Sequence, residues 1–460
     1  MTNKANIIFA NDSKITNDEQ LKAFIENSEG GFITTLLDGA MNVIIKPVKE
    51  EKRTYEEVRN IAGNIARELS ARKVDSGTIE ADALENALSN LDKGEIISAF
   101  VEGWELGAYQ FLTYKSNIEA FQTELEIAGE VDAFIQRGKV RAQAVSFSRD
   151  LMNEVPNVLN PETFPDVLVD AFKDTNAKVT VYRKEKLEEM EMNGVLSVCR
   201  ASKYEPAFVE IAYLGDESKP HIALVGKGVT FDTGGISLKS GRDLSDMRMD
   251  MGGAAAVAGA MKLLVESKAK VNVTALIPIV ENMPDQQSLL PSEVIRYKNG
   301  LTVQVGNTDA EGRLILADGL IRAGDLNADY IVDIATLTGA IGNALGPKIA
   351  GVFGDEALSI DLKIIGEENG DYIWPMPLID AYDSTLASDY ADMSNISTLS
   401  SAGSITAGLF LRRFVPKEAK WLHVDMAGVM ASSQARGYYP KTATGFGARL
   451  LADFAINVSK

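Results

Sequence analysis

Apolar and polar positions alternate in blocks along the second part of the chain and predict two kinds of element. Apolar runs of strand length occur at 207–214, 221–226, 271–279, 301–305, 329–335 and 349–353. Stretches with apolar residues at helical spacing occur at 252–266 and 314–324. Strands and helices in alternation favour a mainly parallel sheet covered by helices. The predicted fold class is therefore α/β.

A smaller α/β domain is expected before this region. The run 42–46 is strand-like, and apolar residues recur at helical spacing over 56–67. A helix should stop before Pro156, because the residue preceding a proline avoids helical geometry. Asn160 then resembles the cap of a new helix, with Pro161 in its first turn. A chain of 460 residues exceeds the usual size of one core, so we predict two domains, at 1–146 and 147–460.

Charge and cysteine content limit the partners and the compartment. The formal net charge is −19, which disfavours nucleic acid and anionic membranes as partners. The single cysteine, Cys199, permits no intrachain disulfide and fits a reducing cytoplasm. The apolar run at 7–10 is too short for a signal segment, and no charge-free stretch reaches membrane-spanning length. We expect a cytoplasmic protein with no membrane contact.

Charged residues gather in three glycine-rich blocks, at 225–239, 247–254 and 307–314. Seven charged residues of these blocks are the candidate site residues, four carboxylates, two lysines and one arginine: Asp232, Asp250, Asp309, Glu311, Lys227, Lys239 and Arg313. Four buried carboxylates without counter-charge would be very costly. Two divalent cations would neutralise them, and oxygen-rich sites suit Mn, Mg or Zn. The blocks therefore predict a pair of metals, an arrangement that recurs in hydrolytic enzymes.

Each residue taken singly has a plainer interpretation. An aspartate in a glycine-rich turn is more often a turn residue or a cap, and Asp309 could cap a helix beginning near Glu311. Lys227 alone would be assigned to the surface, and Lys239 and Arg313 could be salt-bridge partners of the acids. Their functional interpretation is stabilisation of an oxyanion and anchoring of an anion.

Other catalytic arrangements find little support in the sequence. Neither a phosphate-binding loop nor a serine nucleophile elbow is present. His221 and His423 lie in apolar strand-like runs and are expected to be structural. The predicted site therefore lacks the usual side-chain general base.

The three blocks resemble the leucyl (cytosol) aminopeptidase family, the M17 metallopeptidases. The run Asn307 to Leu314 matches the family signature without a change, and the other two blocks match as well. Further matching runs at 102–109, 149–153, 333–340 and 422–428 extend the resemblance over roughly residues 100–460. The resemblance implies that the larger domain is a catalytic domain with a dinuclear metal site.

The resemblance also implies a role for each polar residue of the site. Lys227, Asp232, Asp250 and Glu311 would bind the tighter metal. Asp232, Asp309 and Glu311 would bind the more exchangeable one, so Asp232 and Glu311 would bridge. Lys239 would polarise the scissile carbonyl, and Arg313 would hold a bicarbonate that acts as proton shuttle and takes the place of the missing base. The substrate pocket would be formed by Met247, Asn307, Thr336, Leu337, Gly339 and Ala443.

The expected function is that of a leucyl-type aminopeptidase. With two divalent metal ions per subunit, Mn²⁺ or Zn²⁺, it would release N-terminal, preferably apolar, residues from peptide substrates. The family resemblance further implies a homohexamer. A two-metal phosphoesterase is a rival within enzymes, because the same cation pair serves phosphoryl transfer. A scaffold or DNA-binding regulator is a rival outside them, although the charge of −19 argues against DNA and the complete set of site residues argues against an inactive enzyme.

Overall fold

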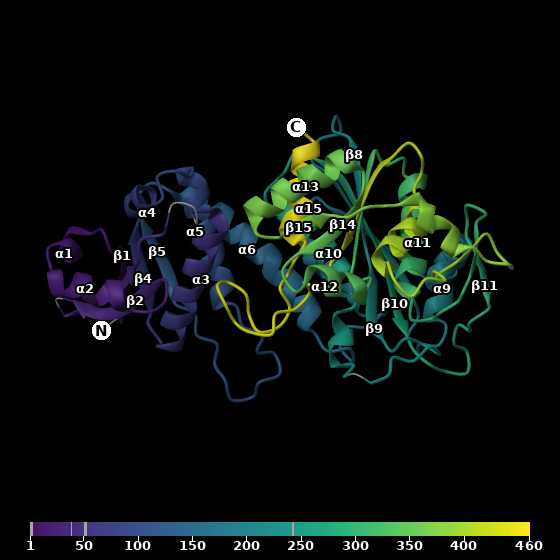
Figure 1. Ribbon diagram of the computed structural model, residues 1–460, viewed down its shortest axis with the longest axis horizontal. Helices are drawn as coiled ribbons and strands as arrows, with labels where there is room; N and C mark the ends of the chain where they lie inside the picture. The colour runs from purple at the N-terminus through teal and green to yellow at the C-terminus, as the bar shows by residue number, and fades with distance from the viewer. Residues whose placement is uncertain (1–2, 38, 50–52, 242) are drawn as a thin grey trace. The chain divides into compact units, whose positions relative to one another are not determined.

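Two compact units make up the chain. The computed structural model describes residues 3–37, 39–49, 53–241 and 243–460. The first unit comprises residues 1–146 together with 368–370 and 432–442. The second comprises 147–367, 371–431 and 443–460. Figure 1 follows the chain from the N-terminus in purple to the C-terminus in yellow.

The first unit is a five-stranded sheet with helices packed on it. The strand order is β2-β3-β1-β4-β5, in which only the β2–β3 pair is antiparallel. Alternate residues of the central strand point into the core, as the burial of Ala5, Ile7 and Phe9 shows. The strands are β1 (Lys4–Phe9), β2 (Phe32–Leu37), β3 (Ala40–Ile45), β4 (Ser76–Glu80) and β5 (Glu124–Ala128).

Two long helices supply most of the apolar surface against this sheet. In α3 (Tyr55–Ala71), Thr54 is the N-cap residue, and its hydroxyl accepts a hydrogen bond from the Glu57 N–H at 3.2 Å. Leu69 and Trp104, one from each long helix, are buried in the same core. The helices are α1 (Ser13–Thr16), α2 (Glu19–Asn27), α3 (Tyr55–Ala71), α4 (Ala81–Ala87), α5 (Lys93–Ala108) and α6 (Asp132–Asn153), which continues into the second unit.

The second unit is built on a nine-stranded, mainly parallel sheet. The strand order is β15-β14-β17-β13-β8-β10-β7-β6, and β9 pairs with the far end of β10. The central strands β17, β13, β8 and β10 are all parallel. The strands are β6 (Lys178–Arg183), β7 (Ala207–Leu214), β8 (His221–Gly226), β9 (Gly228–Asp232), β10 (Asn272–Asn282), β13 (Tyr330–Ala335), β14 (Ala350–Gly354), β15 (Ile373–Pro375) and β17 (Lys420–Asp425).

Helices cover both faces of this sheet, as the sequence predicts for the α/β class. Helices α10 and α15 pack on one face, and α9, α11 and α14 lie over the other (Figure 1). The helices are α7 (Phe164–Phe172), α8 (Lys184–Glu189), α9 (Asn193–Cys199), α10 (Gly252–Glu266), α11 (Glu311–Asp325), α12 (Gly339–Leu345), α13 (Glu356–Asn369), α14 (Gly403–Arg412) and α15 (Ala448–Val458), with the short 3₁₀ helices η2 (Ser245–Met249) and η3 (Asp380–Leu386).

Two local expectations differ from the structure. The strand expected at 301–305 does not join the large sheet but forms a small separate one, with the order β11-β12-β16. The helix expected to start at Asn160 begins at Phe164, because Asn160 instead caps a turn by accepting the N–H groups of Glu162 and Thr163. The small sheet consists of β11 (Val294–Arg296), β12 (Thr302–Gln304) and β16 (Met393–Ser394).

None of the helices in the described part of the chain combines the length and apolarity that a membrane-spanning segment requires.

Candidate metal centre

The carboxyl ends of neighbouring strands bring the predicted site residues together. Lys227 follows β8, Asp232 ends β9 and Thr336 follows β13. Because these strands belong to one open sheet, their ends meet at the same edge, where α/β sheets bind ligands. Asp250 and Glu311 arrive from the starts of two helices, Asp250 just before α10 and Glu311 as the first residue of α11. A helix N-terminus favours a nearby negative charge.

The Lys227 ammonium lies between two carboxylates inside the protein. Its Nζ is 2.7 Å from Asp250 Oδ2 and 2.9 Å from Glu311 Oε1, and it donates a hydrogen bond to the Thr336 carbonyl at 3.1 Å. The Thr336 hydroxyl donates to Asp250 Oδ1 at 2.8 Å. Lys227 is only 3% exposed, so the interpretation of a surface lysine is wrong.

A second ammonium lies between two other carboxylates. Lys239 Nζ is 2.7 Å from Asp232 Oδ2 and 2.5 Å from Asp309 Oδ1. The other oxygen of Asp232 accepts hydrogen bonds from Asn282 Nδ2 at 2.8 Å and from the Gly234 N–H at 2.9 Å. Asp309 does not cap α11, because the capping position belongs to Ala310, which has no side-chain acceptor.

Two glycines allow these groups to approach so closely. A Cβ on Gly312 would lie 2.6 Å from Lys227 Cε, so any side chain there would displace the lysine. Gly234 has a φ of +90°, and a Cβ on it would lie 2.8 Å from Asp309 Oδ1. Glycine alone meets both the conformational and the spatial requirement at Gly234. The glycine-rich character of the blocks is thus a packing requirement of the site.

Burial and crowding shift the pKa values of the site. Burial raises the pKa of Glu311 to about 8, with a further upward contribution from the Asp232 carboxylate. Burial raises the pKa of Asp250 to about 6 against the opposing effect of Lys227. Burial alone would lower the pKa of the Lys227 ammonium, but the surrounding carboxylates outweigh it and raise that pKa. The site therefore holds more carboxylates than its two ammonium groups can stabilise.

The donor set fits divalent cations. One carboxylate oxygen from each of Asp232, Asp309 and Glu311 lies within 4.8 Å of the others. Glu311 Oε2 is buried and has no hydrogen-bond partner among the described residues. An oxygen-only cluster with excess negative charge suits Mn²⁺, Mg²⁺ or Zn²⁺ rather than a thiolate-selected metal. Such a cation would supply the counter-charge that the two lysines leave incomplete.

Arg313 lies in the first turn of α11, close to Glu311, and is buried. Its Nη1 donates to the Asn395 carbonyl at 2.8 Å, and its Cζ lies 5.9 Å from the ring centroid of Phe410. Burial lowers the pKa of the guanidinium to about 10, while Glu311 and Asp425 act in the opposite direction. Its Nε has no hydrogen-bond partner among the described residues. A buried guanidinium with a free donor suits a small planar anion.

The predicted pocket residues differ in how closely the structure ties them to the carboxylate cluster. Thr336 touches the cluster directly, and Asn307 accepts the Asp309 N–H on its Oδ1 at 2.8 Å. Near Thr336 and Asp250 along the chain lie Leu337, Gly339 and Met247. Ala443 pairs with Ala431 in an isolated bridge, and its place in the pocket stays a prediction.

Sequence reasoning did not identify three residues that support the site. Asn282 holds both Asp232 and the Thr308 carbonyl, and Asn395 holds Arg313. Asp425 ends β17 and accepts N–H groups from Leu337 and Thr338. The ends of β10 and β17 could have suggested Asn282 and Asp425, since they reach the same sheet edge. No sequence signal marks Asn395.

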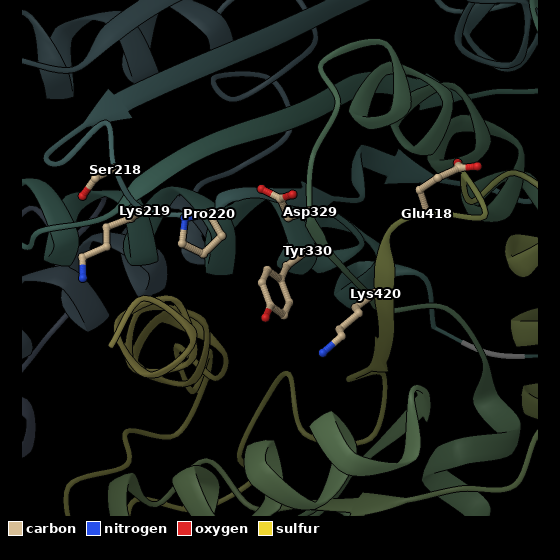
Figure 2. Close-up of a pocket in the computed structure, with 7 residues that line it drawn as sticks. All are labelled: Ser218, Lys219, Pro220, Asp329, Tyr330, Glu418 and Lys420. Atoms are coloured by element: carbon tan, nitrogen blue, oxygen red, sulfur yellow. The ribbon is translucent and has the colours of Figure 1, made fainter.

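A depression of about 560 Å³ lies elsewhere in the second unit (Figure 2). It includes Pro220, Tyr330 and Lys420, which precede or begin β8, β13 and β17, so it lies at the amino ends of strands whose carboxyl ends form the site. Its lining mixes lysines with Asp329 and Glu418 and has no single charge. It is therefore separate from the carboxylate cluster.

Comparison with known families defines the chain as a peptidase. The catalytic-domain model of the cytosol aminopeptidase family matches residues 146–452, and the N-terminal-domain model matches residues 49–117. The chain belongs to the cytosol aminopeptidase family and is a metallo-aminopeptidase, a hydrolase of peptide bonds. The match at 49–117 therefore extends the family relationship to residues before 100, where the sequence motifs alone showed no resemblance.

Similar proteins span most of the chain. A protein of Persephonella marina named "Probable cytosol aminopeptidase" is 39% identical over 426 residues, which are 90% of this chain and 85% of that protein. One of Rickettsia felis with the same name is 38% identical over 88% of this chain and 83% of its own length. The structure titled "Bottromycin maturation enzyme BotP in complex with Mn" superposes with a TM-score of 0.90 at 29% identity and full coverage of both chains.

Proposed function

We propose that this aminopeptidase is of the leucyl type and works with two divalent cations per subunit, Mn²⁺ or Zn²⁺. The carrying observation is the convergence of four carboxylates, three of them almost fully buried, around two ammonium groups. The tighter cation would be held by Lys227, Asp232, Asp250 and Glu311, and the more exchangeable one by Asp232, Asp309 and Glu311. Cations held in this way polarise a carbonyl and lower the pKa of water.

The charged side chains at the rim of the cluster would act on the substrate. Lys239 is 14% exposed at its side chain, which leaves its ammonium able to donate to the oxygen of a scissile carbonyl. Arg313 would hold a bicarbonate ion, supported by its unpartnered Nε and by burial that excludes water. The bicarbonate would carry the proton in place of a histidine, because His221 bonds to Thr274 and to the Leu326 carbonyl, and His423 bonds to Asp333.

The substrate would be a peptide with a free, apolar N-terminal residue. The proposed pocket residues Met247, Thr336, Leu337, Gly339 and Ala443 carry no ionisable side chain, so a charged substrate side chain would lose hydration without gaining a partner. An acetyl group on the substrate amine would remove the lone pair that a cation needs. Cytoplasmic location and assembly as a homohexamer are proposed from family membership alone. Light scattering of the purified protein would measure the oligomeric state.

A substrate panel tests this proposal. Leucine amide should be cleaved, N-acetyl-leucine amide should not, and aspartate amide should be slower by roughly tenfold or more in kcat/KM. A chelator should abolish the activity, and added Mn²⁺ or Zn²⁺ should restore it. Cleavage of the blocked substrate would refute the requirement for a free amine. Equal kcat/KM for leucine and aspartate amides would refute the pocket, and hydrolysis of a phosphate ester in preference to both amides would favour the phosphoesterase rival.

A further inference from the structure

We propose that Asn395 is a positioning residue of the metal centre. Its side-chain amide sets the turn that carries Asp309, and its main-chain carbonyl sets the guanidinium of Arg313. The inference rests on the proposed function, because Asp309 belongs to the more exchangeable cation position and Arg313 to the anion position.

Asn395 lies where the pairing of two strands stops. It is 0% exposed and follows β16, which pairs in parallel with β12. Its own N–H donates to the Gln304 carbonyl at 3.0 Å and makes the last main-chain bond of that ladder. Beyond Gln304 the chain leaves β12 and turns toward the carboxylate cluster. The peptide groups of this turn need partners other than a neighbouring strand.

The Asn395 side chain supplies those partners. Its Oδ1 accepts the N–H groups of Gly306 and Asn307 at 2.7 and 3.2 Å. Its Nδ2 donates to the Asn307 carbonyl at 2.7 Å and to the Ala310 carbonyl at 3.4 Å. The carboxamide thus serves as an additional peptide group and holds both sides of the turn. Only a side chain with one acceptor and a two-proton donor can make all of these bonds.

The turn that Asn395 holds in place also positions Asp309. Asn307, whose main chain is bonded to Asn395 on both sides, accepts the Asp309 N–H on its Oδ1 at 2.8 Å. The position of the Asp309 carboxylate therefore depends on Asn395 through one intervening residue. Partners of this kind, which orient a ligand without touching the cation, typically change metal affinity or activity by about 10–100-fold when they are replaced.

The main-chain carbonyl of Asn395 fixes Arg313 in the same way. It accepts Arg313 Nη1 at 2.8 Å, so one end of the guanidinium is anchored while Nε has no partner among the described residues. The carbonyl keeps this place only while the side chain of Asn395 ties its segment to the turn. Asn395 thereby links the position of the Asp309 carboxylate to the position of the Arg313 guanidinium.

Titration of the metal-stripped, full-length protein with Mn²⁺ tests the proposal. Asn395→Asp keeps the size and the acceptor oxygen but replaces the Nδ2 donor by a second oxygen that faces two carbonyls. Asn395→Ala removes the acceptor and the donor bonds together without adding charge. In both variants the tighter binding event should stay as in the wild type, and the weaker one should lose roughly 10–100-fold in affinity. In the loaded enzyme kcat should fall with little change in KM, because the turn orients reacting groups.

Asn42 offers a matched control in the other unit. It is also buried, and its Nδ2 donates to the carbonyls of Ala40 and Leu37 at 2.9 and 3.4 Å. Asn42→Asp should lower the melting temperature as a buried defect does, yet leave both Mn²⁺ events and kcat unchanged. Wild-type titration curves for both Asn395 variants, or an equal loss of Mn²⁺ affinity in Asn42→Asp, would overturn the role of Asn395. A wild-type protein without a second Mn²⁺ event would overturn the proposed function itself, and this proposal with it.

Discussion

Replacing Lys239 by methionine tests whether this lysine acts on the scissile carbonyl or only holds the carboxylate ligands in place. Methionine keeps an unbranched side chain but removes the positive charge that lies 2.7 Å from Asp232 and 2.5 Å from Asp309. Two unit charges 4 Å apart attract by about 4 kcal/mol at an effective dielectric constant near 20. Breaking a buried ion pair by removing one partner costs about 3–5 kcal/mol, because the other charge stays buried. We expect the metal-stripped variant to lose that much stability, or roughly 5–10 °C in melting temperature.

Divalent cations should abolish most of this loss. A cation held by Asp232 and Asp309 supplies the counter-charge that the missing ammonium no longer provides. Both metals should therefore bind at least as tightly as in the wild type, and the loaded variant should melt close to the loaded wild type. If Lys239 acts on the scissile carbonyl, kcat should nevertheless fall about 100-fold or more, as it does when one oxyanion donor is lost.

The measurement combines calorimetry with and without Mn²⁺, elemental analysis of the purified protein, and turnover of leucine amide. Lys262→Met is the control, since Lys262 pairs with Glu266 at 2.5 Å on a partly exposed face of α10. That pair contributes about 0.5 kcal/mol or less, so its loss should change neither metals nor kcat. Wild-type turnover in Lys239→Met would refute a role in the reaction. Loss of a metal would show instead that Lys239 maintains the geometry of the ligands.

Three further predictions follow from individual residues. Asp250→Asn keeps the shape of a buried carboxylate but removes its charge, so Mn²⁺ titration should show one event weakened by about 100-fold, and two unchanged events would rule Asp250 out as a ligand. Burial raises the pKa of the Cys199 thiol to about 12, so a thiol reagent should modify the protein only after unfolding. Rapid modification of the native protein would show that Cys199 is not buried. Burial lowers the pKa of His221, so the unfolded state binds the proton more readily and stability should decrease as pH falls through about 6.5. Melting curves against pH should show a smaller acid-side loss in His221→Gln, and an unchanged slope would assign that loss to other groups.

The sequence predicted the parts of the fold that have one dominant pattern. The run 221–226 coincides with β8, and 252–266 coincides with α10, because uninterrupted apolar or helical periodicity is sufficient to specify a buried element. The short strand at 301–305 has a similar pattern but belongs to the small sheet. It pairs with the neighbouring β11 on one side and, on the other, with β16 about 90 residues later, and local periodicity carries no information about which sheet such partners form. The start of α7 differs from the predicted one for a related reason, because an asparagine before a proline caps a turn as readily as a helix.

The candidate site shows the same division between local and distant information. Its charged residues could be proposed from sequence because each block is contiguous and because excess buried carboxylate has few chemical uses. The residues that hold those blocks in place are separated from them by long stretches, 50 residues between Asn282 and Asp232 and 82 between Asn395 and Arg313. Asparagine in a loop is also common enough to attract no notice. A carboxamide becomes informative only when the fold shows it satisfying several main-chain groups at once, as Asn395 does. Sequence therefore indicates which atoms could bind a cation, while the fold indicates which atoms determine whether those ligands are held at a usable spacing.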